Sequence, residues 1–137
     1  MMTWDDVVAH VRARFAVIDA GDEHVVVGWK AGGGVHAQRL DLATAFGAPW
    51  LRVASSLGDR AAAHADTLMS HNATLAIGAL AFDGDTVVLH HLTPLALLVP
   101  DHLELVVKQI AHEAVRLRVH GLRTQVRAGL DEFHFYA

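Results

Sequence analysis

Histidine is the residue type with the greatest chemical potential in this chain, which has eleven histidines among 137 residues. To bring two imidazoles to one metal ion, a helix must space them three or four residues apart and a strand two apart. No pair of histidines in the sequence has any of these separations. A site assembled from separate elements would draw first on His71, His91 and His112. The spacing therefore favours surface or hydrogen-bonded core histidines, and a dispersed metal site is the alternative.

Other catalytic signatures are missing or broken. His112-Glu113 begins like the HExxH motif of zinc proteases, but Arg116 stands where the second histidine belongs. The chain has no G-x-S-x-G motif and no cysteine, which excludes thiolate nucleophiles and disulfides. The glycine triplet at 32–34 lacks the Lys-Ser/Thr of a phosphate loop and predicts a hairpin turn. We therefore expect no enzymatic activity, no cofactor and no metal. A metal-dependent hydrolase that uses dispersed histidines is the alternative.

Composition narrows the class of protein. Apolar residues make up 53% of the chain and charged residues 19%, which excludes disorder and leaves apolar surface for self-association or a ligand. The net charge of −4 argues against a nucleic-acid partner. The longest apolar run, residues 75–82, is too short to span a membrane, and the acidic amino-terminal segment is not typical of a secretory signal. We expect a cytoplasmic protein that binds neither nucleic acid nor membrane. Its many histidines should make solubility and dimerisation sensitive to pH between about 7 and 5.5.

Hydrophobic periodicity predicts three helices and five strands. The first helix starts at a Thr3–Asp6 capping box, and its apolar stripe continues to Ile18. The predicted strands are residues 24–30, 35–42, 50–55, 74–82 and 86–92. The second helix is predicted from a cap at Asp59 to Asn72, and the third from Pro100-Asp101 to Leu117. The order is thus α-β-β-β-α-β-β-α, an α+β fold in which an antiparallel five-stranded sheet packs against helices. Residues 1–137 form a single domain, with 121–137 as a C-terminal extension in which a helix resumes to about Gly129.

Five short segments within this order carry a resemblance to a known family. They are Ser55-Ser56-Leu57-Gly58, the helix end Leu68-Met69-Ser70-His71-Asn72, Ile77-Gly78, the hairpin at 82–89 and the break Leu92-Thr93-Pro94-Leu95. The pattern, which covers Thr3 to Val119, resembles the type III secretion chaperone (Tir chaperone, CesT-like) fold and the related YbjN-like family. The resemblance implies a small cytoplasmic homodimer without enzymatic activity. In the secretion branch such dimers hold an extended segment of a partner protein, and the YbjN-like branch contains regulators. The isoelectric point of about 6.2 and the histidine content depart from the secretion branch.

The residues and the resemblance together predict a non-enzymatic protein-binding module. In this hypothesis a chaperone-like homodimer holds an extended segment of a partner polypeptide, and a YbjN-like regulatory dimer without peptide cargo is the alternative. The predicted partner-binding residues come from the first helix and first hairpin: Trp4, Val8, Phe15, Val25, Val27 and Trp29. The predicted dimer contact is formed by Leu68, Ala76 and Gly78. Partner binding would use strand addition at a sheet edge or pockets for alternate side chains.

Overall fold

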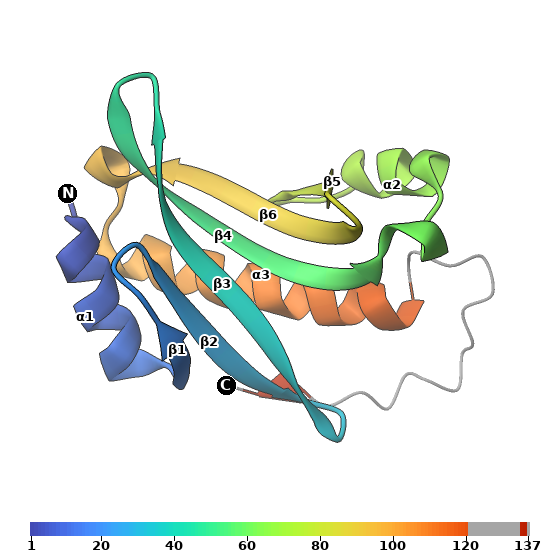
Figure 1. The fold of residues 1–137 in the computed structure, drawn as a ribbon, viewed down its shortest axis with the longest axis horizontal. Helices are drawn as coiled ribbons and strands as arrows, with labels where there is room; N and C mark the ends of the chain where they lie inside the picture. Colours follow the sequence, from blue (N-terminus) through green and yellow to red (C-terminus); the bar gives the residue numbers. More distant parts are fainter. Residues whose placement is uncertain (121–134, 137) are drawn as a thin grey trace.

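The computed structural model describes residues 1–120 and 135–136, which form one antiparallel sheet with helices around it (Figure 1). Six strands lie in the order β1-β2-β3-β4-β6-β5, and the two-residue strand β7 pairs with β2 beside β1. The elements follow one another as α1 (Trp4–Arg14), β1 (Val17–Ala20), β2 (His24–Ala31), β3 (Gly34–Ala45), β4 (Ala48–Asp59), the 3-10 helix η1 (Arg60–Ala62), α2 (Ala65–Asn72), β5 (Ala79–Asp83), β6 (Thr86–Pro94), the 3-10 helix η2 (Leu95–Leu97), α3 (Pro100–His120) and β7 (Phe135–Tyr136).

The α+β class is confirmed, but the predicted count of five strands was too low. The Thr3–Asp6 capping box forms as expected, with reciprocal bonds of 2.9 and 3.1 Å between side chain and backbone. The first helix nevertheless ends at Arg14, and Val17–Ala20 forms an additional strand against β2. Ile18 fits the helical stripe by spacing, yet it is β-branched like Val17; Val17, Asp19 and Ala20 pair with β2, and Ile18 lies at the register shift between Val17 and Asp19. The short β7 is the second addition.

The middle of the chain also departs from the predicted boundaries. Asp59 ends β4 rather than capping a helix, and α2 starts only at Ala65, after a turn of 3-10 helix. The fourth predicted strand, 74–82, begins at Ala79 instead of residue 74 and is β5 of the structure. Pro100 occupies the first turn of α3, a position where its missing N–H needs no helical acceptor. The predicted helix at 121–129 lies outside the described residues.

The hydrophobic core lies between one face of the sheet and α3. Inward side chains of the central strands alternate with outward ones and meet the apolar stripe of α3, whose buried members are Leu103, Val106, Val107, Ile110, Ala111, Ala114, Val115 and Leu117. One polar side chain crosses this core. Gln38 accepts a bond from the Trp29 indole N–H (2.9 Å) and donates to the Val107 carbonyl (3.0 Å). These bonds tie the sheet to the middle of α3 without leaving the buried amide unpaired.

Candidate functional site

The face of the sheet opposite α3 is one candidate surface among the described residues. Figure 1 looks onto this face, with α3 behind the strands. Paired side chains cross it in rows, one of which runs Val26, Arg39, Ala54, His90 and Ala79 over five strands. The adjacent positions hold small side chains or valine: Gly28, Ala37, Ser56, Val88 and Ala81. We call this surface the open face. An exposed antiparallel face usually carries polar side chains, so one this rich in alanine is unusual.

The charged side chains of the open face pair with one another. Arg39 Nε lies 2.8 Å from Asp41 Oδ1, and Arg52 Nη2 lies 3.6 Å from Asp83 Oδ2. The two arginines and two aspartates balance one another, and the exposed Lys30 on the same face of β2 adds one cation. His90 lies among these groups, and burial, followed by the nearby Arg52, lowers its pKa. The open face therefore combines small apolar side chains with paired charges.

The β3–β4 hairpin projects beyond the other strands (Figure 1) and ends in an exposed aromatic residue. Phe46 and Gly47 form its two-residue turn, both with positive φ (53° and 73°), as the twist of such a hairpin requires. Asparagine or glycine ordinarily fills the first position, because a left-handed conformation costs a bulky L-residue about 1–2 kcal/mol. Phe46 is also 97% exposed. The tip thus holds a strained aromatic side chain that its own protomer does not cover.

Further apolar side chains continue from the tip onto the open face. The Phe46 ring lies 6.2 Å from the ring of Trp50, whose indole N–H donates to the Ala45 carbonyl at 2.9 Å. Trp50 pairs with Pro94 across β4 and β6, and Leu92, on the same face, is 44% exposed. We call Phe46, Trp50, Leu92 and Pro94 the hairpin-end surface. The sequence analysis missed it, although Gly47 at the second turn position is a hairpin signal.

The structure corrects the predicted partner-binding surface. Phe15, Val25, Val27 and Trp29 are buried in the core, so they do not form an exposed surface. The alternation in 24–30 correctly separates two faces, but the apolar one packs against the protomer's own helices. Trp4 and Val8 are partly buried against the core at its margin. The Trp4 indole N–H donates to the Asp22 carbonyl at 3.1 Å, which holds α1 on the turn before β2.

Two of the three predicted dimer contacts are likewise internal. Leu68 is 5% exposed and belongs to the core. Gly78, at φ +79°, lies so close to α3 that an added Cβ would be 2.6 Å from Ile110 Cδ1. The small residue does permit close packing, but its partner is the protomer's own helix. Only Ala76 is exposed, in the loop between α2 and β5.

The three histidines singled out for a dispersed metal site are not assembled into one. Among residues 1–120, no group of three or more His, Asp or Glu side chains is placed to hold a metal ion. The His91 ring instead lies 6.5 Å from His102 on α3, and burial, followed by His102, lowers the pKa of His91. His36 is buried with its Nδ1 3.3 Å from Arg118 Nη1. Burial, reinforced by Arg118, lowers the pKa of His36 to about 4, so it is neutral at pH 7.

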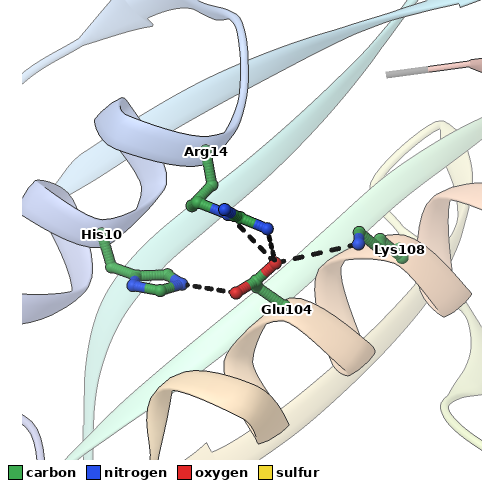
Figure 2. Close-up of polar contacts among 4 residues, drawn as sticks. All are labelled: His10, Arg14, Glu104 and Lys108. Atoms are coloured by element: carbon green, nitrogen blue, oxygen red, sulfur yellow. Dashed lines mark hydrogen bonds and ion pairs between the residues drawn. The ribbon is translucent and has the colours of Figure 1, made fainter.

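A polar cluster around Glu104 joins α1 to α3 (Figure 2). Glu104 Oε2 lies 3.0 Å from His10 Nε2, and Oε1 lies 3.2 Å from Arg14 Nη2 and 3.7 Å from Lys108 Nζ. The hydrogen bond with His10 is the main cause that lowers the pKa of Glu104. Beside His10 is a shallow hollow of about 470 Å³, lined by Met1, Met2, Asp6, Ala9, His10 and Pro100. The cluster keeps Glu104 ionised and fixes the position of α1 on the domain.

The two sheet edges differ in how far their backbone groups are paired. On β5, the Asn72 side chain accepts from Leu80 N–H at 2.6 Å and donates to the Leu80 carbonyl at 3.2 Å, as a neighbouring strand would. On β2, the positions beyond β1 pair with β7, Ala31 with Phe135 and Lys30 with Tyr136. Asn72 and β7 thus occupy part of the edges, whereas the outer side of the edge strand β1 has no strand partner among the described residues, so strand addition stays open there. The open face and the hairpin-end surface are further candidates for contact with another chain.

No protein-family model matches this sequence, and a comparison with curated proteins finds no match. Among the described helices, none is long and apolar enough to cross a membrane.

Proposed function

We propose that this protein is a non-enzymatic protein-binding module, a homodimer that holds an extended segment of a partner polypeptide. The observation that supports this proposal best is the apolar hairpin-end surface, where Phe46 is 97% exposed next to Trp50 and Leu92 is 44% exposed. Contiguous apolar surface of this kind is typical of interaction sites. The β5–β6 hairpin between α2 and α3 matches the order that the family resemblance implies, whereas four strands rather than three precede α2.

The hairpin-end surface is the part assigned to the partner segment. A rigid, exposed aromatic anchor beside a second aromatic ring is the usual composition of a binding hot spot. The backbone strain at Phe46 has no benefit within the protomer, because the Phe46 side chain contacts little of the rest of the protomer. Strain retained at an exposed site favours a role in binding.

Phe46→Asn tests this assignment. Asparagine suits the left-handed turn, so the variant should be more stable by about 1 kcal/mol, or about 4 °C in Tm. The same variant should bind a permanently unfolded polypeptide, fluorescently labelled reduced and carboxymethylated lactalbumin, about tenfold or more weakly, as measured by anisotropy. A gain in stability coupled to a loss of binding is not expected of a purely structural residue.

Met69→Asn is the matched control, because Met69 is also exposed but lies on α2, outside the hairpin-end surface. It should leave the affinity for the polypeptide unchanged. Equal binding by wild type and Phe46→Asn would contradict the assigned surface. A dimer that binds no unfolded polypeptide would instead favour the YbjN-like regulatory dimer without cargo.

A further inference from the structure

We infer that the open face is where two copies of this chain meet, packing sheet against sheet. This inference rests on the homodimer of the proposed function. It adds which surface forms the interface and how the two sheets lie against each other. A second copy is a suitable occupant because a two-fold interface must be complementary to itself. The open face meets this requirement in shape, charge and size.

The shape follows from the small side chains along the middle of the face. Ala37 and Ser56 are exposed, whereas Ala54 (8% exposed) and Val88 (6%) are already buried within the protomer. Two sheets pack about 10 Å apart when their side chains interdigitate, and small side chains allow that approach. An extended single segment would cover only a narrow track of such a face.

The charges also suit a second copy. Arg39 and Asp41 form one ion pair, and Arg52 and Asp83 form another. A face that carries charges of both signs can place them opposite their complements on a second copy, and Lys30, near one end of the face, adds a single cation. Each copy's arginines can also meet the other's aspartates when the sheets are related by a two-fold axis.

The size is close to what a stable dimer needs. Five strands, β2, β3, β4, β6 and β5, contribute to the face. At a spacing of about 4.8 Å and a length of about 30 Å they give a footprint of about 700 Å² per copy. Standard interfaces bury roughly 800 Å² on each partner. The open face therefore accommodates a complete interface without help from the helices.

His90 gives this interface a defined response to acid. Its ring lies in the central row between Ala54 and Ala79, and the groups that act on it are Arg52, Asp83 and His91. Arg39 occupies the same row on β3. Protonation of His90 would place a third cation beside Arg39 and Arg52, and only the carboxylates of Asp41 and Asp83 would balance these three charges. The dimer should therefore weaken as the pH falls.

Sedimentation velocity on three proteins tests the inference. Wild type should sediment at twice the protomer mass. Ala37→Arg, which places a long cation in the middle of the open face, should sediment as a monomer with unchanged circular dichroism. Ala76→Arg, at an exposed loop position that the sequence predicted as a dimer contact, should remain a dimer. A dimeric Ala37→Arg, or a monomeric Ala76→Arg, would overturn the open face as the interface while leaving the homodimer standing. A monomeric wild type would overturn both.

Cross-linking keeps the inference testable if Ala37→Arg does not fold. The chain has no native cysteine, so a single introduced thiol has no competing site. Ala37→Cys should form a covalent dimer with a short bis-maleimide, whereas Ala76→Cys should not. Efficient cross-linking at residue 76 with none at residue 37 would overturn the face-to-face arrangement.

Discussion

Acid titration of His36 gives a prediction whose size follows from the structure. The buried imidazole has a pKa of about 4 in the folded protein, against an ordinary value near 6.5. Between these values the unfolded chain takes up a proton that the folded chain excludes, so stability falls as the pH drops through this window. From about pH 7 to about pH 5 this one group should remove about 2 kcal/mol from the free energy of unfolding. Above pH 7 it contributes no further change.

His36→Asn separates this effect from the other titrating groups. The asparagine carbonyl can take the place of Nδ1 as acceptor for Arg118, and it does not titrate. Urea unfolding should therefore show that the free energy of unfolding falls between about pH 7 and about pH 5 by about 2 kcal/mol less in the variant than in wild type. Each protein is compared with itself at the two pH values, so a lower stability of the variant at pH 7 does not affect the result. Equal losses in both proteins, or a His36 NMR titration centred near 6.5, would refute the reasoning.

Three more predictions concern packing, an edge contact and association. Gly78→Ala should destabilise the protein by about 1–3 kcal/mol in urea unfolding, because φ is positive and the new methyl would contact Ile110; unchanged stability would show that the loop moves freely. Asn72→Ala should cost about 1–2 kcal/mol by removing both bonds to Leu80, with Asn72→Asp, which keeps only the acceptor, in between. Because the pKa of His90 is lowered from 6.5, dimer dissociation should increase as the pH falls below about 6.5 and should increase less in His90→Gln; a profile that is the same in both proteins would contradict the role of His90.

Local signals in the sequence predict much of the fold. The Thr3–Asp6 capping box involves neighbours three residues apart, and the glycine-rich turn after β2 brings two adjacent strands together. The boundary between α1 and β1 was missed because Val17 and Ile18 fit a helical stripe and a strand equally well. Only pairing with β2, which lies further along the chain, decides between them.

The candidate site was harder to predict, for a different reason. Alternation in β2 separates Val25 and Val27 from Val26, but it does not say which face α3 will cover. The more apolar face was taken for a binding surface and is the core. The actual open face depends on alanines from three strands, β3, β4 and β5, that come together only in the sheet. Phe46 was missed because the first position of such a turn is normally asparagine or glycine. With phenylalanine at that position, the sequence lacks the usual dipeptide that predicts a two-residue hairpin turn.

The most direct test of the account is a single sedimentation velocity run on wild type mixed with the fluorescently labelled unfolded lactalbumin, recorded by protein absorbance and by fluorescence. The account predicts a species of at least twice the protomer mass that carries the label with it. A protomer that sediments alone while the label stays with the free polypeptide would contradict it.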